Sequence, residues 1–123
     1  MTRQEIFDKW MEHVSKGMGQ CRDKVTGTCL YYDKTNGNMC AIGSLMKDPE
    51  KYADFCGGVE SLFVIHGEEL KDEPWFQTIP DDVYNEEIFL CSLQSLHDTY
   101  GNWRKNKLKK KVLEEFKKDW GLR

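Results

Sequence analysis

The sequence lacks any long hydrophobic run, and no stretch approaches the roughly 20 apolar residues that span a bilayer. Its first residues, MTRQEIFDKWMEHV, contain neither a continuous apolar segment nor a small-residue cleavage site, so they lack the features of a signal peptide. We therefore predict a soluble cytoplasmic protein that makes no contact with a membrane.

Common catalytic and cofactor signatures are missing as well. The chain has no glycine-rich phosphate loop, no G-x-S-x-G and no H-E-x-x-H, which mark many nucleotide-binding proteins, serine hydrolases and zinc proteases. Its five cysteines form no C-x-x-C pair, and the ten-residue spacing of Cys29 and Cys40 is wide for a pair of metal ligands. We therefore predict no metal and no cofactor, and we expect free thiols in a reducing cytoplasm.

Length and composition indicate one domain covering residues 1–123. With 39% hydrophobic and 12% aromatic residues, the chain can form one modest core, and it is too short for two ordinary domains. Its charge is uneven: residues 104–123 carry nine basic and three acidic side chains, whereas residues 68–87 carry eight acidic side chains and one lysine. Opposite fields of this kind can steer a partner or bring two copies together as a head-to-tail homo-oligomer.

Three segments have the periodicity of amphipathic helices. In residues 3–16 apolar side chains recur at helical spacing, and Thr2 with Glu5 forms a capping-box pattern. Residues 86–100 carry a second apolar stripe, and residues 103–119 carry a third opposite a lysine-rich face. These patterns predict a mostly helical protein.

The centre of the chain allows more than one structure. The patches at residues 29–32 and 39–42 flank Asn36-Gly37, a pair typical of tight hairpins, so they predict a small β-hairpin. The second patch can also begin a helix near Cys40, and we favour one strand, a turn and then that helix. We find no internal repeat and no linker. The fold class we expect is therefore α+β, a mostly helical single domain with a small β-hairpin.

Three further segments follow. The sequence Asp48-Pro49-Glu50 predicts a short helix ending at Gly57-Gly58. Residues 59–67 suit either a buried strand or a buried helix, because their run of apolar side chains has no clear period. Residues 68–82 are acidic and contain two prolines, which predicts a long surface loop with its aromatic pair folded inward.

Cys40 and His97 are the candidate catalytic residues. A thiol becomes a nucleophile when its pKa is lowered, and a helix N-terminus and a nearby imidazole both have that effect. Asp98 cannot orient the His97 ring, because successive side chains on a helix point about 100° apart. The alternative is a small buried cysteine and a histidine that satisfies a backbone group. The sequence leaves both open, and with them whether the protein is an enzyme.

Trp75, Phe76 and Trp103 are the candidate binding residues, since tryptophans contribute strongly to the energetics of protein interfaces. The basic run RKNKLKKK at residues 104–111 invites comparison with phosphate-binding surfaces. However, the isoelectric point of about 5.6 is far below that of typical nucleic-acid-binding modules. The sequence thus favours a protein partner over a nucleic acid.

Several stretches resemble a family of small proteins encoded by bacteriophages and bacteria. They are RQEIFDKW, CLYYDKTNGNMCAIGSLM, LQSLHD with Trp103 after it, and the terminal WGL. They are similar to the family pattern Q-E-I-F-[DN]-K, then C-[AL]-Y-R and [KR]-C-A-[IV]-G-x-L, then L-Q-x-[IL]-H-D. The chain departs from it at Tyr32 and Met39, where the family usually has basic residues, so an anion-binding role of those positions does not carry over.

The resemblance brings no assigned activity, but it implies a phage-type protein acting in the cytoplasm of the host. The positions that match it are Cys29, Cys40, Ala41, Gly43, His97 and Asp98. Together with the small size, the split charge and the missing catalytic signatures, it favours a non-enzymatic accessory protein that binds a host or defence protein. The alternative is a thiol-dependent hydrolase or transferase with Cys40 as nucleophile and His97 as base.

Overall fold

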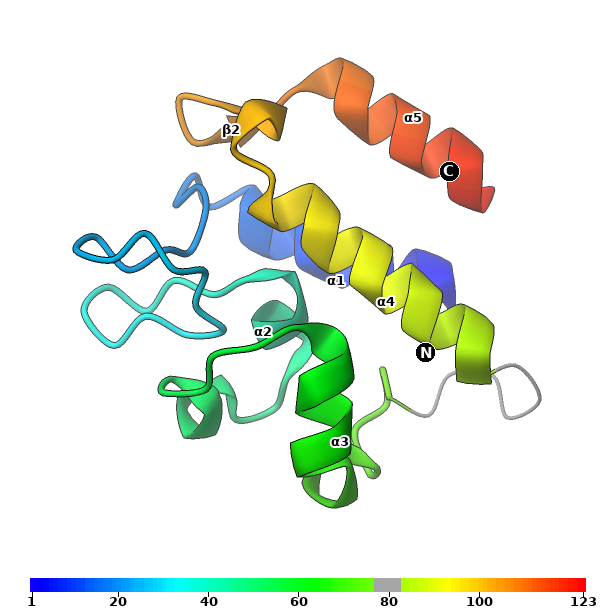
Figure 1. Ribbon diagram of the computed structural model, residues 1–123. Coiled ribbons are helices and arrows are strands. Elements are labelled where there is room, and N and C mark those ends of the chain that lie inside the picture. The colour runs from blue at the N-terminus through cyan, green and yellow to red at the C-terminus, as the bar shows by residue number, and fades with distance from the viewer. Residues whose placement is uncertain (77–82) are drawn as a thin grey trace.

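The computed structural model describes residues 1–76 and 83–123 (Figure 1). The elements are α1 (Arg3–Val14), α2 (Ala41–Leu45), the 3₁₀ helix η1 (Pro49–Tyr52), α3 (Val59–Leu70), α4 (Val83–Asp98), the 3₁₀ helix η2 (Tyr100–Asn102), β1 (Trp103–Arg104), β2 (Lys107–Leu108) and α5 (Lys110–Trp120). The predicted fold class, a mostly helical α+β domain with a small hairpin, is confirmed. None of the helices in these ranges is long and apolar enough to cross a membrane.

Helix α1 begins with the predicted capping box. The Thr2 hydroxyl accepts from the Glu5 backbone N–H at 3.1 Å, and the Glu5 carboxylate accepts from the Thr2 backbone N–H at 2.9 Å. These reciprocal bonds satisfy N–H groups that a helix end otherwise leaves free. The helix then turns its apolar stripe into the core, where Ile6 and Trp10 are wholly buried.

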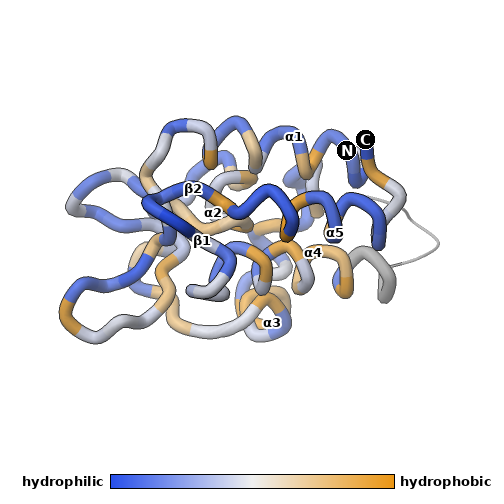
Figure 2. Tube along the Cα trace, turned by 90° about the horizontal axis from the view of Figure 1, so that it is seen from above, coloured by the Kyte–Doolittle hydropathy of each residue, from blue (hydrophilic) through white to orange (hydrophobic). Residues whose placement is uncertain are grey.

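Helices α1, α4 and α5 meet around a cluster of aromatic rings. Phe7 of α1 stacks on Phe116 of α5 at a centroid distance of 5.8 Å, and Phe89 of α4 packs against Phe116 at 6.0 Å. Trp120 packs edge-on against Phe89 at 5.1 Å. In both Figure 1 and Figure 2, α4 lies between α5 and α3. The strongly hydrophilic colour in Figure 2 follows β1 and β2 and alternates with hydrophobic colour along α5.

The β-hairpin lies in a different place from the one predicted. It pairs β1 with β2 in the register Trp103↔Leu108, and its turn residues Lys105 and Asn106 adopt left-handed backbone conformations with φ of 51° and 64°. Asparagine tolerates this conformation, and paired left-handed residues match the twist of a two-residue hairpin. The prediction of a continuous helix over residues 103–119 was therefore wrong at its start, and α5 begins at Lys110.

Residues 21–40 form two consecutive loops of the same backbone pattern (Figure 1). Each is closed by an isolated antiparallel bridge, Arg22↔Cys29 in the first and Tyr32↔Met39 in the second. In each, a glycine N–H donates at 2.8 Å to the carbonyl of the aspartate four residues earlier; the pairs are Gly27 with Asp23, and Gly37 with Asp33. The sequence Asp-Lys-x-x-Gly thus occurs twice, ten residues apart. This short internal repeat corrects the expectation that the chain has none.

The segments after these loops follow the predictions in part. Helix α2 starts directly after Cys40, as favoured from the sequence. The segment after Asp48 forms only the short 3₁₀ helix η1, so the predicted helix up to Gly57-Gly58 was too long. The ambiguous apolar run is α3, which continues into the predicted surface loop as far as Leu70. Residues 77–82 of that loop lie outside the described residues.

Candidate functional site

Cys40 is the N-cap residue of α2 and is wholly buried. Its Sγ atom accepts a hydrogen bond from the Gly43 backbone N–H at 3.3 Å, an interaction that favours a thiolate. Burial nevertheless raises the pKa of the Cys40 thiol well above its ordinary value, and this effect outweighs the hydrogen bond. The Cys40 side chain is therefore a protonated thiol that solvent does not reach.

His97 is also wholly buried, and the lone pair of its Nδ1 atom is already used. The Trp10 indole N–H donates to His97 Nδ1 at 3.1 Å. Because indole is only a donor, Nδ1 carries no proton, so a neutral ring has its proton on Nε2. Burial, together with nearby His13 and Arg22, lowers the pKa of His97 to about 3. The ring therefore has no free lone pair with which to take a proton from a thiol.

Helix α4 presents Gln94 to Cys40, and no hydrogen bond joins Cys40 to His97 in the part of the chain described here. The Gln94 side chain lies beside the Cys40 thiol, and its Oε1 atom accepts from the backbone N–H of Ile42 at 3.0 Å. Its Nε2 atom donates to the Asp98 carboxylate at 2.8 Å. The catalytic pairing of Cys40 with His97 stays a prediction that the geometry does not support.

Asp98 connects Cys40 and Gln94 to the two consecutive loops of residues 21–40, called the tandem loops below. Its carboxylate lies beside the Cys29 thiol, and its backbone carbonyl accepts from the Arg22 guanidinium. Burial raises the pKa of Asp98, and the hydrogen bond from Gln94 lowers it in part. Asp98 thus does not orient His97, as expected from the sequence, and instead holds the first loop against α4.

Gly43 completes the contact between α2 and the second loop. A Cβ atom at this position would lie 2.1 Å from the Tyr31 carbonyl oxygen, so only glycine fits here. Ala41, the residue between this glycine and Cys40 that also matches the family pattern, is wholly buried. The residues that carry the family resemblance therefore have structural roles, because they pack the two loops and α2 against α4.

The three aromatic binding candidates do not form one surface. Trp75 is wholly buried, with its ring 6.2 Å from Phe63 and its indole N–H bonded to the Glu73 carboxylate. Phe76 is partly buried and packs edge-on against Phe63 at 4.8 Å. Trp103 is partly buried and donates its indole N–H to the His97 carbonyl oxygen at 2.7 Å. These side chains stabilise the fold, and Trp75 in particular is not accessible to a partner.

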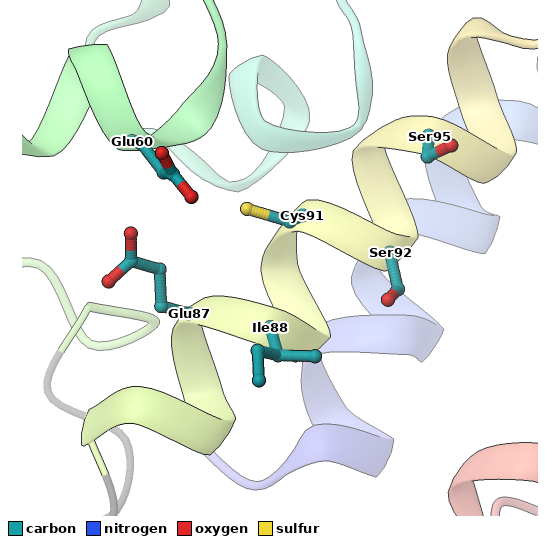
Figure 3. A pocket seen from close by; sticks show the side chains of 6 residues that line it. All are labelled: Glu60, Glu87, Ile88, Cys91, Ser92 and Ser95. Atoms are coloured by element: carbon teal, nitrogen blue, oxygen red, sulfur yellow. The ribbon is translucent and has the colours of Figure 1, made fainter.

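An open groove between α3 and α4 is the feature that the sequence reasoning missed (Figure 3). It has a volume of about 300 Å³ and is lined by Glu60, Glu87, Ile88, Cys91, Ser92 and Ser95. Figure 3 shows the carboxylates of Glu60 and Glu87 facing each other, with the Cys91 thiol beside them. Burial raises the pKa of this thiol, and the two carboxylates raise it further. The sequence signal was Glu87, which belongs to the acidic stretch noted above.

Comparisons with protein-family models, with curated proteins and with solved structures found no match to this chain. The resemblance to the phage-encoded family therefore stays a prediction, and the interpretation of the site depends on its geometry.

Proposed function

We propose that this chain is a small phage-type accessory protein that acts by binding a host or defence protein and does not catalyse a reaction. The observation that carries the proposal is the state of Cys40 and His97, the two catalytic candidates predicted from the sequence. A thiol enzyme needs a thiolate that its substrate can reach and a base that can accept a proton. Cys40 is buried and protonated, and the His97 lone pair is occupied by Trp10.

The surface supports a binding role. The groove between α3 and α4 is open and acidic, while the exposed basic side chains gather in the β1–β2 hairpin and at the start of α5 (residues 104–111), on the other side of α4. Such separated fields guide partners of complementary charge into one orientation. The proposed place of action is the host cytoplasm, in agreement with the absence of membrane-spanning helices among the described residues.

The first experiment tests the catalytic alternative by titrating the native protein with a thiol reagent across pH. We expect Cys56, which is exposed, to react first, and the partly buried Cys29 and Cys91 to react more slowly. Cys40 should react only when the protein unfolds, so Cys40→Ala should leave the native reaction unchanged. A thiol that reacts rapidly below about pH 7 and disappears in Cys40→Ala would establish a reactive nucleophile instead.

The second experiment tests binding directly. The tagged protein is incubated at low salt with a lysate of the host, beside an unrelated tagged protein of similar isoelectric point. We expect one host protein to be retained specifically and in stoichiometric amount. Retention of the same proteins by both baits would count against the proposed function.

A further inference from the structure

Helix α3 has an apolar flank that no described residue covers. Only Val59, Leu62 and Leu70 of this helix are fully buried, whereas Val64 is 85% exposed. The next residue, Ile65, is 63% exposed. Helix α3 thus presents two adjacent apolar side chains to solvent.

This flank borders the groove. Val64 follows Glu60 by one helical turn and therefore lies on the same side of α3. On α4, Ile88 is 38% exposed and lies next to Glu87 in the wall of the groove. The lining of the groove thus contains the Glu60 and Glu87 carboxylates, Ile88 and, on α4, the Cys91 thiol (Figure 3), and Val64 lies one turn beyond Glu60 on α3.

The charges of the groove are not neutralised within the described part of the chain. Neither the Glu60 nor the Glu87 carboxylate forms an ion pair or a hydrogen bond with the side chains described in residues 1–76 and 87–123. Like charges that face each other across a groove repel, and a cation placed between them removes that cost. Helix α5 lies across α4 from α3 (Figures 1 and 2), and none of its lysines forms an ion pair with Glu60 or Glu87.

We propose that the groove between α3 and α4 binds a basic amphipathic helix of the partner protein, an inference that rests on the proposed function. The apolar side of that helix contacts Val64 and Ile88, and its arginine or lysine side chains pair with Glu60 and Glu87. Helices that dock in this way present apolar anchors at intervals of one turn. Arginine is the better match, since its planar guanidinium forms two parallel hydrogen bonds with a carboxylate.

The test uses a fluorescent peptide of leucine and arginine at helical spacing, with the length of α3. A peptide of the same composition, scrambled so that it has no apolar side, serves as the comparison. We expect the amphipathic peptide to bind about tenfold more tightly than the scrambled one. In a Cys56→Ser background, bound peptide should also slow the reaction of Cys91 with a thiol reagent, which locates the site in the groove.

Matched variants separate the groove from the net charge. The double variant Glu60→Gln/Glu87→Gln should lose about tenfold or more in affinity for the amphipathic peptide. The control Glu12→Gln/Glu50→Gln changes two exposed acids elsewhere by the same charge and should lose less than about threefold. Equal losses in the two double variants, or equal binding of the scrambled peptide, would overturn the proposal. So would a dimer of the protein alone that only the groove variant dissociates, because a second copy would then be the occupant.

The lysate experiment distinguishes this inference from the function on which it rests. If the wild-type protein and Glu60→Gln/Glu87→Gln retain the same host protein equally well, the proposed function stands and the groove is not its site. If the wild-type protein retains no host protein but binds the amphipathic peptide in the groove, the groove stands and the proposed function fails.

Discussion

His97 lies in the core with its Nδ1 atom accepting from Trp10, while Trp103 packs edge-on against the same ring at 5.2 Å. Two indoles and a lack of solvent thus keep the imidazole neutral. The histidine predicted as a general base is therefore a hydrogen-bond acceptor for the indole N–H of the buried Trp10. This arrangement makes the stability of the protein sensitive to acid.

We expect unfolding to become easier as the pH falls below the ordinary histidine pKa of about 6.5. The folded-state pKa of His97 is about 3. Between these two values the unfolded chain binds a proton that the folded protein does not, so stability is full above about pH 6.5 and falls below it. The loss for one such residue approaches about 1.4 kcal/mol per pH unit. Burial also lowers the pKa of His13, which adds to the effect.

Urea unfolding between about pH 7 and about pH 4.5 measures this dependence. His97→Gln is the matched variant, because a glutamine carbonyl can accept from an indole N–H and does not titrate. Carboxylates contribute equally to both proteins, so the difference between the two curves isolates the imidazole. Parallel curves would show that His97 does not resist protonation.

A second prediction at the scale of one residue concerns the stability of the variant Gly43→Ala. Gly43→Ala forces a methyl group against the Tyr31 carbonyl oxygen, and both atoms belong to packed backbone. We expect the free energy of unfolding to fall by about 1–3 kcal/mol. Gly67→Ala is the control, because Gly67 lies inside α3 with no atom within 4 Å of the added methyl. That change should raise stability by about 0.5–1 kcal/mol, and a larger loss than for Gly43→Ala would contradict the packing described here.

At the scale of elements, the apolar stripes of α1 and α4 predicted both helices, because each stripe extends over several turns. In α4, Leu93 belongs to this stripe and is wholly buried. Ser95, two residues later, is exposed. The two positions therefore test the stripe within one helix.

Leu93→Ala should lower the free energy of unfolding by about 2–5 kcal/mol, since it removes buried apolar atoms and leaves a cavity. Ser95→Ala should change it by less than about 0.5 kcal/mol. Thermal or urea unfolding of both variants measures the difference. An unchanged melting temperature in Leu93→Ala would show that this side of α4 is not packed in the core.

The tandem loops place two aspartates in equivalent positions but at different depths, so the effect of burial on the same interaction can be compared. Asp23 and Asp33 occupy equivalent positions, and each carboxylate accepts from a backbone N–H two residues later, at 2.8 Å and 2.9 Å. Asp33 is 7% exposed and its carboxylate also accepts from the Thr35 hydroxyl, whereas Asp23 is more accessible to water.

We expect Asp33→Ala to cost about 1–3 kcal/mol of unfolding free energy, because it removes a buried carboxylate that accepts from both the N–H and the hydroxyl of Thr35. Asp23→Ala should cost less, since water can replace the lost carboxylate. Urea unfolding of the two single variants provides the comparison. A larger cost at Asp23 would mean that the first loop, and not the second, is the better packed of the two.

Neither the repeat of the tandem loops nor the position of the β1–β2 hairpin was predicted from the sequence. Three shared residues in ten are too few to be noticed without the paired bridges that the structure shows. The lysine-rich residues 103–109 have a composition typical of a helix. The contact of Trp103 with the His97 carbonyl and the left-handed turn at Lys105 and Asn106 make them a hairpin and a connecting segment instead.

At the scale of the whole molecule, the polarity read from the sequence becomes a spatial arrangement. The basic residues 104–111 and helix α3, which forms one wall of the acidic groove, lie on different sides of α4 (Figure 1), so one molecule presents two fields of opposite sign. Had both lain on one face, they would have neutralised each other locally.

The sequence by itself determined the fold class, the capped start of α1, the stripe of α4 and the start of α2 after Cys40. These features depend on residues within a few turns of one another, so local patterns are sufficient to predict them. Only the tertiary structure decided that Cys40 lies beside Gln94, that Trp75 is buried, and that Glu60 and Glu87 face each other across a groove. These arrangements depend on how α2, α3 and α4 pack, and packing joins side chains whose separation along the chain carries no periodic signal.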